Sequence, residues 1–158
     1  MKLYHGTNAV FDKIDLSKSK PNKDFGKGFY LSPDYDQALN MANIKTEQLQ
    51  EGQPLVMFFE VDESDINALH TLLVEDYNEQ WVEFILANRS NDTDKPIHDY
   101  DIVIGPIADD RVGVQLWKYE NQLIDLSTLV SNLKYMKDMT IQYYFGTEKS
   151  LSILKRIR

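Results

Sequence analysis

The sequence contains no cysteine. This absence excludes disulfides, thiolate metal sites and a cysteine nucleophile, and it leaves the redox compartment open. Histidine is scarce as well, with His5, His70 and His98 as its three copies. Their spacing does not match the histidine and carboxylate patterns of zinc or iron sites. We therefore expect no metal centre.

Long apolar runs and glycine-rich nucleotide loops are also missing. No run of apolar residues reaches the roughly 20 that a membrane-spanning helix needs, and the first residues lack the apolar core of a signal peptide. Neither G-x-G-x-x-G nor a Walker loop is present, which excludes a Rossmann or P-loop site. The formal net charge of −8 disfavours broad nucleic-acid binding. We expect a cytoplasmic protein with no membrane partner.

The chain has 158 residues, of which 42% are apolar, and this length suits a single domain over residues 1–158. Hydrophobic patterning predicts five strands, at Lys2–His5 (an edge strand), Phe29–Leu31, Pro54–Val61, Asp101–Ile107 and Ile141–Phe145. It predicts four helices: from a Ser32 cap to a point before Gly52, over Asp76–Arg89, from a Ser127 cap through Met136, and from a Thr147 cap through Leu154. The C-terminal basic residues Lys155–Arg158 are interpreted as a solvated end. The irregular alternation of these elements favours an α+β fold.

Two short segments combine residues that suit a ligand pocket. His5 ends the first predicted strand, Gly6 removes the Cβ that would block close backbone approach, and Thr7 adds a hydroxyl. Gly26 and Gly28 then frame a tight loop that leads into the strand of Tyr30. Each residue alone also has an ordinary structural interpretation, as a turn or core residue.

Taken together, these segments resemble a known family. The order and spacing of Leu3–Thr7, Asp24–Pro33 and Gln37-Ala38 resemble the opening of the ADP-ribosyltransferase superfamily. The likeness is to its diphtheria-toxin and poly-ADP-ribose-polymerase branch, whose signature is His, Tyr, Glu. The chain is more similar still to small bacterial proteins of that superfamily that form a domain of unknown function, through Trp81–Arg89, Asp101–Asp110 and Gln142–Thr147.

The resemblance implies a split, bent β-sheet with flanking helices and an NAD cleft between its halves. In that cleft His5 would bond a ribose hydroxyl, the backbone of Gly6 would hold the carboxamide, and Tyr30 would stack on the nicotinamide. An aromatic face attracts a planar cation by roughly 0.5–2 kcal/mol, and one backbone unit offers the donor and acceptor that an amide needs. The other residues expected at the cofactor are Thr7, Asp24, Phe25, Gly26, Gly28 and Phe29.

The sequence departs from the superfamily pattern in two places. A second tyrosine on the following helix is missing, because Gln37–Met41 contains no aromatic residue and Tyr35 comes too soon. Met41 offers a softer sulfur contact there. Gln142 takes the position of the catalytic glutamate, where it can bond a ribose hydroxyl but cannot stabilise a cation or take a proton.

Other acids offer a substitute for the missing glutamate. The pair Asp109–Asp110 after a strand end is the first choice, and Glu83 is a further candidate. Both have ordinary interpretations, as turn and capping residues for the pair and as a solvated helix face for Glu83. Lys27 is a candidate contact for a phosphate of NAD.

The expected function is therefore an NAD-dependent mono-ADP-ribosyltransferase that moves ADP-ribose to an unidentified acceptor and releases nicotinamide. His5, Tyr30, Gln142, Asp109 and Asp110 are its candidate catalytic residues. The acceptor would be a protein, a nucleic acid or a small molecule, and a toxin-like role would fit the superfamily. The alternative is a non-catalytic module that binds NAD, ADP-ribose or a protein through a degenerate site, which the substitution at Gln142 favours.

Overall fold

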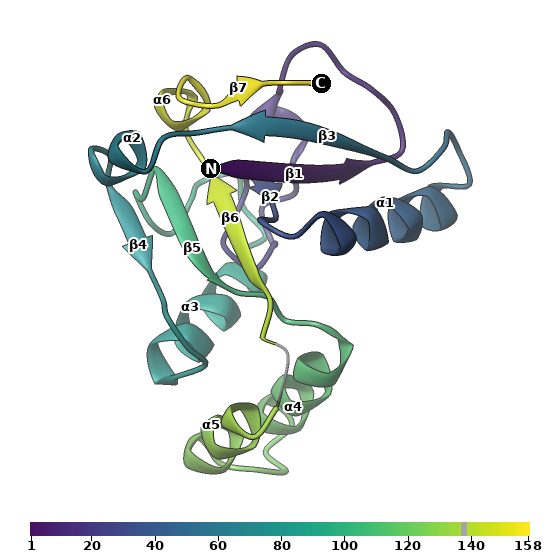
Figure 1. The fold of residues 1–158 in the computed structure, drawn as a ribbon. Coiled ribbons are helices and arrows are strands. Elements are labelled where there is room, and N and C mark those ends of the chain that lie inside the picture. Colours follow the sequence, from purple (N-terminus) through teal and green to yellow (C-terminus); the bar gives the residue numbers. More distant parts are fainter. Residues whose placement is uncertain (137–138) are drawn as a thin grey trace.

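The computed structural model describes residues 1–136 and 139–158, and its strands form two sheets that run in different directions (Figure 1). One sheet has the order β1–β3–β7 and the other the order β2–β6–β5–β4. The strands are β1 (Lys2–Thr7), β2 (Phe29–Leu31), β3 (Leu55–Glu60), β4 (Thr71–Leu73), β5 (Ile102–Pro106), β6 (Ile141–Phe145) and β7 (Lys155–Arg156). Of these neighbours only β4 and β5 are parallel. We call the two sheets the β1 sheet and the β6 sheet.

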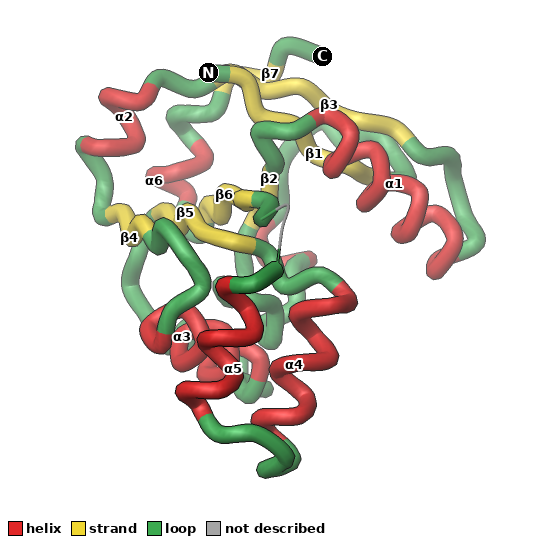
Figure 2. The backbone as a smooth tube through the Cα atoms, turned by 60° about the horizontal axis from the view of Figure 1, so that its bottom comes forward, coloured by secondary structure: helices red, strands yellow, loops and turns green. Residues whose placement is uncertain are grey.

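Helices flank both sheets, so the expected α+β class is confirmed (Figure 2). They are α1 (Tyr35–Leu49), α2 (Glu63–Asn67), α3 (Glu79–Arg89), α4 (Asp110–Glu120), α5 (Leu126–Lys134) and α6 (Glu148–Leu151), with a 3-10 turn at Leu16–Lys18. Helix α1 lies along β1 and β3, and α4 and α5 form a pair beyond the far end of the β6 sheet. Within the described residues no helix is long and apolar enough to cross a membrane.

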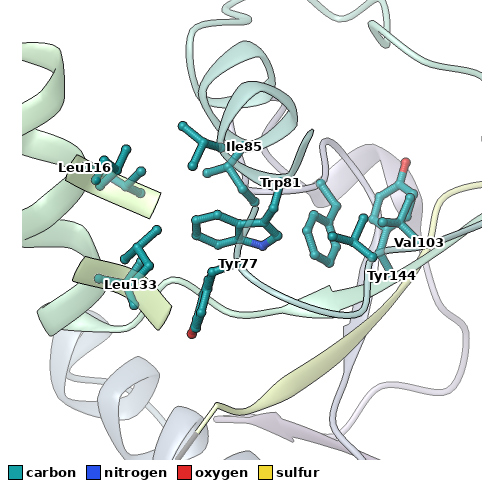
Figure 3. Close-up of a cluster of buried hydrophobic side chains, with 12 residues drawn as sticks. Tyr77, Trp81, Ile85, Val103, Leu116, Leu133 and Tyr144 are labelled. Carbon is teal, nitrogen blue, oxygen red and sulfur yellow. The ribbon is translucent and has the colours of Figure 1, made fainter. Parts of the chain in front are cut away.

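Two hydrophobic clusters lie on opposite faces of the β6 sheet, because neighbouring residues of a strand point to opposite sides. Ile102 and Phe145 belong to the cluster that fills the space between the two sheets. Val103 and Tyr144, their neighbours in sequence, belong to the cluster under α3, α4 and α5 (Figure 3). In that cluster Trp81 is fully buried, and its indole N–H donates to the carbonyl of Pro106 at 2.9 Å.

Several predicted helix ends were wrong. The N-cap of α1 is Asp34, not Ser32, and the N-cap of α5 is Asp125, not Ser127. Asp34 accepts hydrogen bonds from two backbone amides of the first turn of α1, and Asp125 accepts one from the first turn of α5. Aspartate is as good an N-cap residue as serine. Helix α3 begins after Asn78 rather than at Asp76, while Thr147 does cap α6 as predicted.

The sequence interpretation also missed or misplaced five elements. Helices α2 and α4 and the short strand β4 were not predicted, and α6 ends at Leu151 rather than continuing to Leu154. The interpretation of Lys155–Arg158 as a solvated end is wrong for the backbone, because Lys155 and Arg156 form β7 on β3. Their side chains remain exposed.

Gly6 allows α1 to lie directly against β1. A Cβ at Gly6 would stand only 1.9 Å from the carbonyl oxygen of Ala38, which is backbone and has no room to move. We therefore expect Gly6→Ala to lower the free energy of unfolding by about 1–3 kcal/mol or more, measured by urea denaturation. Gly113→Ala is the matched control, because nothing lies within 4 Å of its added Cβ. A Gly6→Ala protein as stable as the wild type would contradict this packing.

Candidate functional site

One ring nitrogen of His5 bonds to the backbone of β2, the edge strand of the β6 sheet. Its Nδ1 lies 2.7 Å from the backbone oxygen of Tyr30. A carbonyl only accepts, so Nδ1 carries the hydrogen and a neutral ring presents Nε2 as an acceptor. Burial lowers the pKa of His5 to about 4, helped by the charges of Lys45 and Lys23. The ring is therefore neutral at pH 7 and able to receive a hydrogen bond from a hydroxyl.

The free edge of β1 lies beside this histidine. Tyr4 exchanges both of its backbone hydrogen bonds with Ser32, at 2.8 Å each, on the side of β1 opposite β3. Because hydrogen-bonding direction alternates along an antiparallel strand, the N–H and C=O of Gly6 point to that same side. Continuing the antiparallel register from the Tyr4–Ser32 pair would bring Gly6 opposite Tyr30. The donor and acceptor of Gly6 thus lie next to the segment that holds His5.

Tyr30 is held rigidly at the edge strand β2. Its hydroxyl donates to the carbonyl of Gly26 at 2.5 Å and accepts from the N–H of Phe25 at 3.0 Å. Phe25 stacks on its ring at 6.3 Å between centroids, and Tyr144 packs edge-on at 5.4 Å. Burial raises the pKa of the Tyr30 hydroxyl well above its usual value, so it stays neutral. The ammonium of Lys23 lies 5.4 Å from the centre of the same ring.

The loop before β2 is held by two contacts from distant segments and by the conformation of one glycine. Asp24 forms an ion pair with Arg89 of α3, with 2.7 Å between Oδ1 and Nε. His98 donates from Nε2 to the carbonyl of Phe25 at 2.7 Å. Gly26 has φ +97, a conformation that favours glycine. These contacts fix the loop against which Tyr30 is anchored.

Arg89, His98 and Lys23 were not recognised from the sequence as part of this region. His98 is 73 residues from the carbonyl that it bonds, and such a separation leaves no local pattern. Arg89 belongs to the segment Trp81–Arg89 that resembles a known family. Its ion pair with Asp24 could not be predicted, because the two residues are 65 positions apart in the sequence. Lys23 stood among other loop lysines that suggested only an exposed segment.

Several residues expected at the cofactor are buried in the fold itself. Phe25 and Phe29 lie on opposite sides of the β6 sheet, one in each hydrophobic cluster. The hydroxyl of Thr7 donates to the carbonyl of Ala9 at 3.2 Å. Gly28 is needed because an added Cβ would stand 2.2 Å from a ring carbon of Tyr144. These residues support the site through packing and turn geometry.

Gln142 lies on the same face of the β6 sheet as Tyr30. Tyr30 pairs directly with Tyr144, and Gln142 is two residues along β6 from that partner, which keeps it on the same side. Within the described part of the chain its side chain has no hydrogen-bond partner, and it is only partly buried. A residue at this position is therefore available to a ligand on the Tyr30 face.

The other acids occupy different surroundings. The carboxylate of Asp109 caps α4, accepting from the N–H of Val112 at 3.0 Å, and it contacts Arg111 at 3.4 Å. Asp110 follows in the first turn of α4. Glu83 is exposed on α3, and Lys27 forms a 3.6 Å ion pair with Asp94. The capping interpretation of Asp109 is therefore confirmed, while a role of these residues at NAD stays a prediction.

A hollow of about 500 Å³ lies at the start of α4. It is lined by Arg89, Ala108, Asp109, Asp110, Gly113, Val114 and Trp117. Arg89 links this hollow to the loop of Asp24, so the candidate acids and the tethered loop are neighbours through one guanidinium. Among the described residues no group of three or more histidine, aspartate or glutamate side chains is arranged to hold a metal ion.

The region expected for the missing second tyrosine contains exposed side chains. Tyr35, at the start of α1, packs edge-on against Tyr4 at 5.6 Å and Phe58 at 5.8 Å. It therefore covers the outer face of the β1 sheet. Met41 is 49% exposed. Among the described residues no ring contact joins Tyr35 to Tyr30.

The fold and this site define an α+β protein with two bent sheets and a histidine–tyrosine pair at the place where they meet. A family model described as "Protein of unknown function (DUF3990)" matches residues 1–156, and the chain belongs to that family. No curated protein matches the chain.

Proposed function

We propose that the protein binds NAD at His5, Gly6 and Tyr30 and transfers a single ADP-ribose to a nucleophile. The observation that carries this proposal is the bond between His5 Nδ1 and the Tyr30 carbonyl, 2.7 Å long. It presents Nε2 as an acceptor next to the segment that carries Tyr30, one residue before Gly6, whose backbone donor and acceptor point away from β3. A ribose hydroxyl, a pyridinium ring and a carboxamide are the three groups that this set fits, and NAD carries them together.

The reaction is a substitution at the carbon that joins ribose to nicotinamide. The C–N bond breaks with its electron pair on nicotinamide, which leaves as a neutral molecule. A lone pair of the acceptor forms the new bond to that carbon, and the acceptor loses a proton. The transition state resembles an oxocarbenium ion, as in glycoside hydrolysis. The chain would contribute orientation of the ribose and of the leaving ring.

A specific observation favours the second candidate function, binding without turnover. The residue on the Tyr30 face where a catalytic glutamate is expected is Gln142, which is neutral and cannot stabilise a cation or accept a proton. Asp109, the first-choice substitute, already caps α4. In this alternative the protein binds NAD, ADP-ribose or a protein partner, and it transfers no ADP-ribose to an acceptor.

Incubation with NAD separates the two functions. Nicotinamide release, followed by chromatography, supports transfer or hydrolysis, and label transfer from NAD to a lysate supports a protein or nucleic-acid acceptor. A rise in melting temperature with NAD but no release supports binding alone. If NAD produces neither release nor a thermal shift, the pocket assignment fails.

Tyr30→Leu tests the stacking role within the same assay. The leucine keeps apolar volume but removes the aromatic face, so we expect the KM or Kd for NAD to rise roughly 2- to 30-fold. Tyr135→Leu is the matched control, because Tyr135 is 87% exposed. Equal NAD affinity in the two variants would contradict stacking on Tyr30. Circular dichroism checks that Tyr30→Leu remains folded, because its hydroxyl also holds the loop at Gly26.

A further inference from the structure

A positively charged side chain of the protein itself lies over the ring of Tyr30. The ammonium of Lys23 lies 5.4 Å from the ring centre, within the distance of about 6 Å at which a cation–π attraction operates. Phe25 and Tyr144 also pack against the ring. They are only 0% and 2% exposed, so they are fixed in the core. Lys23 is exposed. It is therefore the neighbour that can leave when a flat ligand approaches Tyr30.

Like charges surround this lysine. Although the residue as a whole is exposed, partial desolvation of its ammonium lowers the pKa of Lys23, and the positive charges of Lys45 and Lys20 lower it further, opposed by Asp24. Asp24 is itself committed to Arg89 at 2.7 Å. In the described part of the chain the ammonium of Lys23 has no ion-pair partner. An aromatic face therefore holds it in place against electrostatic repulsion.

The local charge is opposite to that of the whole protein. Lysines 13, 18, 20, 23 and 27 stand within one loop segment of a chain whose net charge is −8. Lys45 of α1 acts electrostatically on both His5 and Lys23, so it faces the same place from a different element. Amines gathered beside a hydroxyl acceptor and an aromatic ring suit a ligand that carries a polyanion, because their mutual repulsion is relieved when it binds.

We propose that Lys23 gates the site and sets its specificity. Without a ligand its ammonium covers the ring of Tyr30; when a pyridinium ring takes that place, Lys23 moves with Lys20 and Lys45 onto a pyrophosphate. This inference rests on the proposed function and deepens it. It predicts a preference for ligands that join a cationic ring to a pyrophosphate, since only these both replace the lysine and bind it again.

Two partial ligands separate the two roles of Lys23. 1-Methylnicotinamide carries the cationic ring without phosphate, and ADP-ribose carries the pyrophosphate without the ring. In Lys23→Ala we expect 1-methylnicotinamide to bind roughly 5-fold tighter, because no cation has to leave the ring. We expect ADP-ribose to bind roughly 5-fold weaker, because an attractive charge is lost. Calorimetric titration measures both dissociation constants.

Lys18→Ala is the matched control, because it removes the same charge from the same loop and Lys18 is not among the groups acting on Lys23. It should move neither constant by as much. Lys23→Arg keeps the cation and should restore wild-type behaviour. Opposite shifts for the two ligands in Lys23→Ala support the gate. Shifts of the same sign, or shifts matched by Lys18→Ala, overturn it.

A second measurement needs no binding constant. Protons next to the Lys23 ammonium should show an upfield ring-current shift in the free protein, and 1-methylnicotinamide should move them back downfield. An unshifted signal in the free protein overturns the gate even if NAD binds. If NAD and both partial ligands fail to bind the wild type while the upfield shift is present, the proposed function fails and the lysine–tyrosine contact is purely structural.

Discussion

Gln142→Glu is expected to raise nicotinamide release from NAD by roughly 10²-fold or more. A positioned carboxylate stabilises the developing oxocarbenium charge and takes a proton, and such groups contribute about 10²–10⁴ in rate. The glutamine lies on the Tyr30 face of the β6 sheet, two residues from the partner of Tyr30. Its side chain has no hydrogen-bond partner in the described residues, so the substitution breaks no existing bond there. The measurement is the initial rate of nicotinamide release at saturating NAD.

Gln80→Glu is the matched control for this gain. Gln80 stands exposed in the first turn of α3, so the variant adds the same charge away from β6. An increase specific to Gln142→Glu supports a ribose facing residue 142 and indicates that the natural protein has a site weakened for turnover. An unchanged rate, with NAD still bound, means that residue 142 does not face the ribose.

Local chemistry in the sequence was sufficient to predict most strands and the α+β class. The strand Ile141–Phe145 was predicted with the bounds that it has, because its apolar and aromatic residues are confined by clear turn residues. Helix α4 was missed although Val112 and Leu116 have helical spacing and are buried. Gly113 between them weakens the helical signal, and Asp109–Asp110 had been interpreted as loop acids. In the structure Asp109 is the N-cap of α4, so these acids mark the start of the helix that was missed.

The candidate site was predictable only in its local pieces. His5 and Tyr30 were singled out separately by neighbouring glycines, and their contact links residues 25 positions apart. The tethers that position Tyr30 come from α3 and from the segment before β5, through Arg89 and His98. Such contacts depend on how the elements pack, which no spacing rule contains. The same packing explains why glycines expected to admit a ligand also admit α1 and the ring of Tyr144.

His5→Asn is expected to lower kcat/KM for NAD by roughly 10- to 100-fold. The asparagine amide can still donate to the Tyr30 carbonyl in place of Nδ1, but it offers no acceptor at the position of Nε2. A ribose hydroxyl would then be left unpaired, which costs about 1–3 kcal/mol. The initial rate at low NAD concentration measures the loss. A rate equal to that of the wild type would show that Nε2 does not touch the substrate.

The pH dependence of the stability of the same variant tests whether burial lowers the pKa of His5. Burial lowers the pKa of His5 from 6.5 to about 4, so between these values the unfolded chain binds a proton that the folded protein does not. The stabilisation is complete above pH 6.5 and is lost as the pH falls towards 4, by on the order of 2–3 kcal/mol. Urea denaturation from pH 7 to pH 4 should therefore show a steeper loss of stability in the wild type than in His5→Asn. Parallel curves would mean that His5 titrates normally, and a lost activity could then not be assigned to a neutral Nε2 acceptor.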